Sequence, residues 1–304
     1  MLLDIHQHIW TEPLLDALAA RDELPFVRRD HGLTVLHSVD EHPYVIDTDG
    51  ESVPRRLTLL RRDGLDAAVV ALSSPIGIEA LPGNQARELI AAHLDGVRAL
   101  PDEFGAWGPV ALESPDPADV DRVVNDGCVG VSLPAAALAG PDALDLVDPI
   151  LERTAALGAP LFVHPGPAPA TRRGDVLLGE PLWWRPLTDY VAQMQAAWLS
   201  FAALGRRRHP ELEVIFAMLA GGAPLLSERL SARGGPQVDV RDPLVYYETS
   251  SYGPTAVEAM ARRVGPDQLL YGSDRPVIEP HPTGREAILR ANGARVVPSA
   301  GSLA

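Results

Sequence analysis

Short apolar runs recur along the whole chain at intervals that suit buried strands. Each run is rich in valine, isoleucine, leucine or alanine and is closed by turn-forming residues. Because the runs are almost continuously apolar, they are typical of strands that are buried on both faces of a sheet. We expect eight such strands, at residues 2–8, 67–72, 107–112, 128–133, 160–164, 213–219, 245–249 and 269–273.

Longer segments of helical character separate these runs. In the segment 116–126, Asp116 and Pro117 suit an N-cap and a first helical turn, and Gly127 suits the end of the helix. Gly158 ends the segment 141–157 in the same way. Buried parallel strands that alternate with helices predict an α/β fold, here a single (β/α)₈ TIM barrel formed by residues 1–304. The other expected helices are 84–100, 187–204, 224–232 and 255–264.

The alternation breaks between the first and second strands. Residues 9–64 are too many for an ordinary connection between a strand and a helix, so this segment must have structure of its own. We expect a helix at 12–24 and an antiparallel ribbon formed by 33–38 and 44–47. Because the insertion follows the first barrel strand, we expect it to cap the barrel mouth. At the other end of the chain, we expect residues 298–304 to be a disordered tail.

The composition excludes several kinds of chemistry. The 26 basic and 41 acidic side chains give a net charge of −15, which disfavours nucleic acid as a partner. All 26 basic residues are arginine, so a Schiff base, a lysine-anchored cofactor and a Walker phosphate site are excluded. Cys128 is the only cysteine, so any metal must use histidine and carboxylate ligands. No apolar run approaches the roughly 18 residues that span a bilayer, and we expect a cytoplasmic protein with no membrane partner.

Four residues at the ends of expected strands have the chemistry of a metal site. The strand period of two places His6 and His8 on one face of strand 2–8, with Asp4 one layer below as an acceptor for an imidazole. His164 ends strand 160–164, and Asp274 directly follows strand 269–273. Structural histidines and an aspartate that caps a turn are the alternative reading of each position. Their coincidence at C-terminal strand ends, where barrel active sites are built, favours one divalent metal ion.

The motifs that carry these residues resemble those of the amidohydrolase superfamily. The sequences Asp-Ile-His-Gln-His, Phe-Val-His-Pro-Gly and Tyr-Gly-Ser-Asp-Arg-Pro are similar to those of its amidohydrolase-related branch (amidohydrolase 2), which includes aminocarboxymuconate semialdehyde decarboxylase. The resemblance implies that His6, His8, His164 and Asp274 bind one Zn²⁺, with Mn²⁺ or Fe²⁺ as alternatives. It also implies that Asp274 exchanges protons with the substrate and that a homodimer is an option. Binuclear members use a carboxylated lysine, which this chain lacks, so a single metal is expected.

Strand six departs from the family pattern. In the family this strand ends in a histidine before a glycine-rich turn, and that histidine helps to orient or protonate what sits on the metal. Here the segment Phe-Ala-Met-Leu-Ala-Gly-Gly places Leu219 at the histidine position, or Met218 after a slip of one residue. Neither side chain transfers protons. A positioned acid or base contributes about 10²- to 10⁴-fold, so chemistry that needs this group is expected to be slow unless another residue substitutes.

Three further residues are candidates for substrate binding. Trp184 and Arg185 follow strand five and combine a flat apolar surface with a fixed cation. Their alternative role is to anchor the following helix. Arg275 is suited to hold a carboxylate with two hydrogen bonds, and equally to form a structural ion pair. Glu248, on strand 245–249, is a candidate polar group of the barrel lumen.

These residues predict an enzyme that acts on a small organic molecule. We expect a zinc-dependent hydrolase in which metal-bound hydroxide attacks the substrate, with Asp274 and His164 at the catalytic centre. The alternative is a nonoxidative decarboxylase of a small aromatic or unsaturated carboxylic acid on the same mononuclear site. A second alternative, prompted by Leu219, is a barrel that binds a ligand without catalysis.

Overall fold

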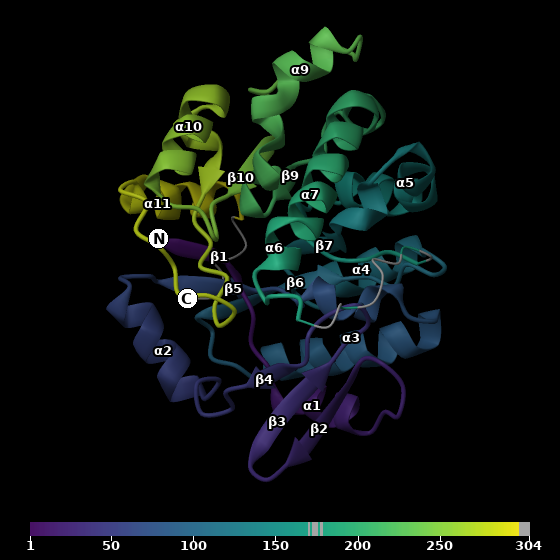
Figure 1. Ribbon diagram of the computed structural model, residues 1–304, viewed down its shortest axis with the longest axis vertical. Coiled ribbons are helices and arrows are strands. Elements are labelled where there is room, and N and C mark those ends of the chain that lie inside the picture. The colour runs from purple at the N-terminus through teal and green to yellow at the C-terminus, as the bar shows by residue number, and fades with distance from the viewer. Residues whose placement is uncertain (170, 172–175, 177–178, 298–304) are drawn as a thin grey trace.

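Eight parallel strands form one sheet in the computed structural model, which describes residues 1–169, 171, 176 and 179–297. Neighbours pair in the order β1-β5-β6-β7-β8-β9-β10-β11. The backbone after β11 returns to β1, where the Asp274 N–H donates to the His6 carbonyl at 2.9 Å. The sheet is thus a nearly closed barrel surrounded by helices, and the predicted (β/α)₈ fold is confirmed (Figure 1). The strands are β1 Leu3–Gln7, β5 Ala67–Val70, β6 Phe104–Pro109, β7 Gly130–Pro134, β8 Leu161–His164, β9 Val214–Phe216, β10 Val245–Glu248 and β11 Leu269–Leu270.

The barrel strands are buried on both faces, which explains their continuous apolar sequences. Every residue of β5 and β8 is buried. Several strands end earlier than the apolar pattern predicts, among them β11, which stops at Leu270 rather than at residue 273. β9 stops at Phe216 rather than at residue 219, because the backbone at Met218 has a φ of 51°, which a strand does not adopt. β6 ends at Pro109 rather than at residue 112, and proline cannot donate a hydrogen bond to the next strand.

Helices cover the outside of the barrel where the sequence predicts them. α4 (Pro117–Asn125) begins after Asp116, whose carboxylate accepts a hydrogen bond from the Ala118 N–H at 2.9 Å. This is the predicted N-cap. α11 (Glu286–Val296) contacts β1, but its apolar residues form no clear stripe, so the pattern does not predict it. The remaining helices after β5 are α3 Gly83–Arg98, α5 Pro141–Ala156, α6 Trp184–Leu187, α7 Asp189–Ser200, α8 Arg206–Arg208, α9 Ser227–Ala232 and α10 Pro254–Val264.

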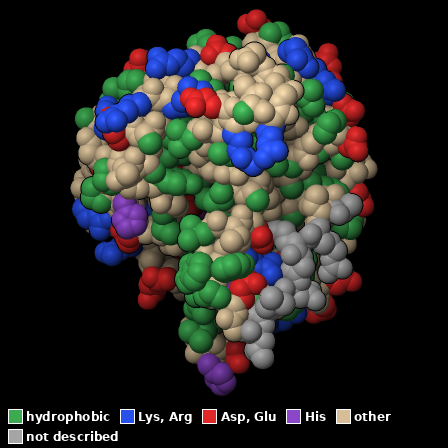
Figure 2. All heavy atoms as spheres, turned by 45° about the horizontal axis from the view of Figure 1, so that its top comes forward, with side chains coloured by type: hydrophobic (Ala, Val, Ile, Leu, Met, Phe, Trp, Pro, Cys, Tyr) green, Lys and Arg blue, Asp and Glu red, His purple; other side chains and the backbone are tan. Residues whose placement is uncertain are grey.

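The insertion after β1 contains two helices and a small antiparallel sheet. The predicted ribbon is confirmed, because β3 (Leu33–His37) pairs with β4 (Tyr44–Ile46) in antiparallel register. A third strand, β2 (Phe26–Asp30), pairs with β3, and this sheet projects from the barrel (Figures 1 and 2). The predicted helix 12–24 is shorter, as α1 (Glu12–Ala19), with Ala20 as its C-cap. The second helix, α2, is Val53–Arg62.

The turn between β3 and β4 contacts the segment that follows β8. Tyr190 on α7 donates its hydroxyl to Glu41 at 3.0 Å, and the Arg185 guanidinium donates to the Asp40 carbonyl. One end of the insertion therefore lies beside the C-terminal ends of the barrel strands. A cap over the mouth stays a prediction. The disordered tail expected at 298–304 lies outside the described residues. Within those described, no helix is long and apolar enough to cross a bilayer.

Candidate metal centre

Three strands bring the four predicted ligands to one place. The alternation of β1 points the His6 and His8 side chains to the same side, and both imidazoles are buried. His164 is the last residue of β8, where Pro165 and Gly166 stop the strand. Asp274 follows β11 with a φ of 57°, and its backbone is tied to His6. All four are at the C-terminal end of the barrel, as the sequence predicts.

The distances within this cluster suit a single metal ion. His6 Nε2 and His8 Nε2 are 3.2 Å apart, and Asp274 Oδ1 lies 3.5 Å from the first and 3.1 Å from the second. The ring of His164 lies 4.9 Å from that of His6 and 5.1 Å from that of His8, centroid to centroid. One ligand atom from each of the four residues lies within 4.8 Å of the others. Ligands about 2.1 Å from a tetrahedral ion are separated by roughly 3.4 Å, close to the short distances found here.

The outer nitrogen of each imidazole is held by an acceptor. His6 Nδ1 lies 3.1 Å from Glu248 Oε2, and His8 Nδ1 lies 2.8 Å from the Ala71 carbonyl. His164 Nδ1 lies 2.8 Å from the carbonyl of the next residue, Pro165. A carbonyl oxygen only accepts, so Nδ1 of His8 and of His164 carries the proton and donates it. Their Nε2 lone pairs then face the cluster, which is the arrangement of metal-binding histidines.

Burial and charge give the three imidazoles different pKa values. The pKa of His164 is lowered well below its usual value, first by burial and then by the neighbouring His6 and His8. For His6 burial also lowers the pKa, but the hydrogen bond and charge of Glu248, together with the charge of Asp274, reverse the net shift and raise it. A cation at the cluster would therefore meet a neutral His164 and two nearby carboxylates.

Glu248 has a larger part in the site than its sequence context indicates. Its carboxylate is completely buried and accepts hydrogen bonds from the Met218 N–H at 3.2 Å and from the Ser250 hydroxyl at 2.8 Å, besides its contact with His6. Gly272 makes room for it, because a Cβ there would collide with the carboxylate. Its position on the inward face of a lumen strand, opposite a glycine, is the signal that sequence reasoning could have used.

Asp4 has a different role from the one expected. Its carboxylate accepts from the backbone N–H groups of His6 and Ser273, at 3.0 and 3.1 Å, and from the Gln7 amide at 2.8 Å. It therefore joins the ends of β1 and β11 through their backbones. The carboxylate that supports an imidazole is that of Glu248, which β10, the neighbour of β11, brings to His6.

The chain after β9 supplies no imidazole to the cluster. Met218, Leu219 and Ala220 have φ values of 51°, 51° and 53°, and the left-handed run continues through Gly221 and Gly222. A left-handed conformation costs about 1 kcal/mol for each residue that carries a Cβ, so the surrounding fold must hold this turn. Leu219 is buried, with 1% of its surface exposed. This turn contacts the cluster through the Met218 backbone, which donates to Glu248.

The predicted substrate-binding residues lie outside this cluster of four. Arg185 is buried and its guanidinium is paired with Glu180 at 2.7 Å, whereas Trp184 is half exposed. Arg275 is buried and its guanidinium contacts Asp63 at 2.7 Å and Glu279 at 2.9 Å. These contacts are the structural ion pair that was the alternative for Arg275. Substrate binding by Trp184, Arg185 and Arg275 stays a prediction.

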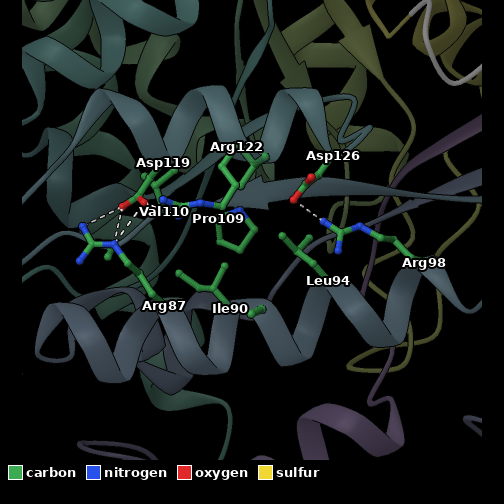
Figure 3. Close-up of a pocket in the computed structure, with 12 residues that line it drawn as sticks. Arg87, Ile90, Leu94, Arg98, Pro109, Val110, Asp119, Arg122 and Asp126 are labelled. Atoms are coloured by element: carbon green, nitrogen blue, oxygen red, sulfur yellow. Dashed lines mark hydrogen bonds and ion pairs between the residues drawn. The ribbon is translucent and has the colours of Figure 1, made fainter.

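A small hollow lies on the outside of the barrel, between α3 and α4 (Figure 3). It has a volume of about 70 Å³, and its arginines face aspartates. Arg87 pairs with Asp119 at 3.0 Å, and Arg98 pairs with Asp126 at 2.7 Å. Because these cations are already paired, the hollow offers no ready site for an anionic ligand.

Comparison with known proteins identifies relatives of this fold. IDCase from Metarhizium anisopliae, in its apo form, superimposes with a TM-score of 0.78 at 18% identity, over 98% of this chain and 97% of that one. The 5-carboxyvanillate decarboxylase of Novosphingobium aromaticivorans, complexed with manganese and 4-hydroxy-3-methoxy-5-nitrobenzoic acid, gives a TM-score of 0.68 at 15% identity, over 98% and 96%. The 2,6-dihydroxybenzoate decarboxylase of Rhizobium gives 0.67 at 20% identity, over 98% of both chains.

At these identities the likeness shows a shared fold. A search of curated proteins finds no sequence match. The family model described as amidohydrolase matches residues 3–299, which is nearly the whole sequence. The resemblance seen in the three sequence motifs is therefore confirmed, and this chain belongs to the amidohydrolase family.

Proposed function

We propose that this protein is a metal-dependent, nonoxidative decarboxylase of a small aromatic or unsaturated carboxylic acid. The observation that carries the proposal is the cluster of His6, His8, His164 and Asp274, with its ligand atoms within 4.8 Å of one another at the C-terminal end of the barrel. The cluster supports a metal enzyme. The choice of decarboxylation over hydrolysis is supported by the similar structures, two of which are named as decarboxylases.

The residues present fit one divalent ion. Three neutral imidazoles and one carboxylate are a common donor set for first-row metals, and the acceptors behind the rings, one carboxylate and two backbone carbonyls, fix their orientation. His6, His8, His164 and Asp274 would hold the ion. When bound, it would act as a Lewis acid that anchors an oxygen of the substrate and stabilises negative charge. We propose Zn²⁺, which histidine and carboxylate ligands commonly bind, or Mn²⁺, which a similar structure contains.

Three side chains of the site then have separate roles in the reaction. His164 stays neutral, so its Nε2 keeps a free lone pair. Glu248 holds the His6 ring by its Nδ1 and prevents it from turning. Asp274 Oδ1, 3.1 Å from His8 Nε2, lies at the edge of the cluster with part of its side chain exposed. From that position Asp274 hands a proton to the substrate carbon as carbon dioxide leaves.

Carbon dioxide release is the direct test. The protein would be loaded with Mn²⁺ or Zn²⁺ and incubated with 2,6-dihydroxybenzoate, 5-carboxyvanillate and related hydroxylated acids, and the released gas measured. We expect release from at least one acid, loss of bound metal and of activity in His6→Ala, and neither loss in the control His31→Ala. His31 is a suitable control because its side chain is 92% exposed in the insertion.

Other results would favour the other readings. If the metal-loaded protein cleaves lactones or amides and releases no carbon dioxide, the zinc-dependent hydrolase is correct and the decarboxylase is wrong. If it binds metal and transforms no substrate of either class, the buried Leu219 marks a binding protein. A His6→Ala variant that retains its metal would show that His6 is not a ligand, and the proposed metal site would be wrong.

A further inference from the structure

One buried acid near the barrel mouth has no role in the site described above. Glu79 lies in the short turn Ile78–Ala80 after β5, and its side chain is completely buried. A buried carboxylate is normally paired with a cation, because an unpaired buried charge is costly. Across the described ranges, no arginine or histidine forms an ion pair with Glu79, and no charged neighbour shifts its pKa. This carboxyl group therefore has another way to remain inside the protein.

Its hydrogen bonds indicate that it is kept neutral. The Ser74 hydroxyl donates a hydrogen bond to Glu79 Oε1 at 2.5 Å. Glu79 Oε2 is buried and has no hydrogen-bond partner within the part of the chain that is described. The backbone is fixed by the Leu112 N–H, which donates to the Glu79 carbonyl at 2.9 Å. Burial raises the pKa of Glu79 to about 7, and the hydrogen bond from Ser74 only partly opposes it. Near neutral pH the group both holds and releases a proton.

The loop that carries Ser74 contacts the segments that hold two of the proposed metal ligands. Ala71, on the same loop, accepts the Nδ1 hydrogen bond of His8 at 2.8 Å. Gly166, two residues after His164, packs so closely on Ser74 that a Cβ there would lie 2.6 Å from the Ser74 Cβ. The loop after β5 thus joins one ligand through its backbone and lies against the loop that follows another. This places the buried pair directly behind the loops that adjoin two of the proposed ligands.

The charged groups on the surrounding elements do not neutralise the pair. Arg87 on α3 is paired with Asp119 at 3.0 Å (Figure 3), and Glu113 after β6 accepts from the Gly83 N–H at 2.8 Å. Burial, followed by the charge of His8, lowers the pKa of His93 on α3 to about 3, so that imidazole is uncharged. The other titratable groups on α3 are Glu88, Asp95 and Arg98, which is paired with Asp126, and β8 contributes His164.

We propose that Ser74 and Glu79 form a proton-transfer pair of this site, in which Glu79 stores the proton that each turnover consumes and the Ser74 hydroxyl passes it toward the mouth. The proposal rests on the proposed decarboxylase function. There the bond between the substrate carbon and its carboxylate breaks, the electron pair stays on the carbon, and carbon dioxide leaves. The carbon takes one proton from Asp274, and Glu79 replaces it. Glu79 becomes a carboxylate and regains a proton from solvent water.

This pair supplies what the end of β9 lacks. The family pattern has a proton-transferring histidine after that strand, and this chain has the buried Leu219 there. An acid is most effective when its pKa is near the working pH, and burial is the usual means of raising a glutamate to that value. Among the described residues Oε2 of Glu79 has no hydrogen-bond partner, so this oxygen is free to carry the proton.

The test compares Glu79→Gln, Ser74→Ala and a matched control, Asp119→Asn, which also removes a buried carboxylate but one that lies between α3 and α4. Carbon dioxide release would be measured from pH 5 to pH 9 in metal-loaded protein, with metal content checked in each variant. We expect the wild-type rate to fall above about pH 7. Both Glu79→Gln and Ser74→Ala should lower kcat by roughly 10²-fold with little change in KM, and Glu79→Gln should lose the break near pH 7. Asp119→Asn should keep both the rate and the break.

Infrared difference spectra give a second readout that does not depend on turnover. Wild-type protein should show a protonated carboxyl band that disappears as the pH rises through about 7, and Glu79→Gln should lack it. The proposal is overturned if that band is absent, or if Glu79→Gln keeps the wild-type rate and pH profile. If Glu79→Gln does not fold, an unchanged kcat in Ser74→Ala overturns it equally. Wild-type protein that releases no carbon dioxide overturns the proposed function and this proposal together.

Discussion

Replacing Glu79 by glutamine should remove one specific part of the pH dependence of stability. The pKa of Glu79 is about 7 in the folded chain, against its ordinary value of 4.5. Between these values the unfolded chain has lost the proton while the folded chain still holds it, so the free energy of unfolding falls as the pH rises. Each pKa unit corresponds to 1.36 kcal/mol, so the ionisation of Glu79 lowers the free energy of unfolding by about 3 kcal/mol between pH 4.5 and pH 7. Above pH 7 both states have lost the proton, and Glu79 causes no further change.

The assay is urea unfolding of metal-free wild-type and Glu79→Gln protein at half-unit steps from pH 4.5 to pH 8. Other groups titrate in this range, so the informative quantity is the difference between the two proteins. Glu79→Gln should gain about 3 kcal/mol relative to wild type across the interval, with most of the change complete by pH 7. Glu152→Gln, an exposed substitution on α5, should show no such gain. A constant difference at every pH would refute the reasoning, because it would mean that Glu79 is ionised in the folded chain or paired.

Three further predictions concern the metal centre and its surroundings. Glu248→Gln should weaken metal affinity by about 10- to 100-fold, measured by competition with a chelator, because it removes the charged acceptor behind His6; an unchanged affinity would contradict this role. Gly272→Ala should lower the free energy of unfolding by about 1–3 kcal/mol and weaken metal binding, since its Cβ would displace the Glu248 carboxylate; full stability would show that the two groups are not in contact. Arg275→Ala should lower stability by about 2 kcal/mol in urea unfolding, because it removes the buried guanidinium that pairs with Asp63 and leaves that carboxylate paired with the exposed Arg62, and should leave KM unchanged. A raised KM at normal stability would instead support its predicted role in substrate binding.

Much of the architecture could be read from local sequence. Apolar runs closed by turn residues predicted the eight strands, because parallel strands buried on both faces need continuous apolar sequence. The pair His6 and His8 could be recognised because the strand period is a property of the backbone. Proline and glycine after His164 marked the end of its strand, and therefore the end of the barrel at which the imidazole lies. Once the barrel was predicted, its geometry implied that these groups meet.

The tertiary structure alone decided the hydrogen-bond and ion-pair partners of these residues. Glu248 reaches His6 across 242 residues of sequence, through a gap that Gly272 leaves, and no local pattern records that contact. Arg275 is next to Asp274 in sequence, but its side chain is paired with Asp63. Glu79 resembles any exposed glutamate in the sequence, and its raised pKa arises only because separate loops bury it. Periodicity is local and survives in the sequence, whereas desolvation and ion pairing depend on what the rest of the chain places nearby.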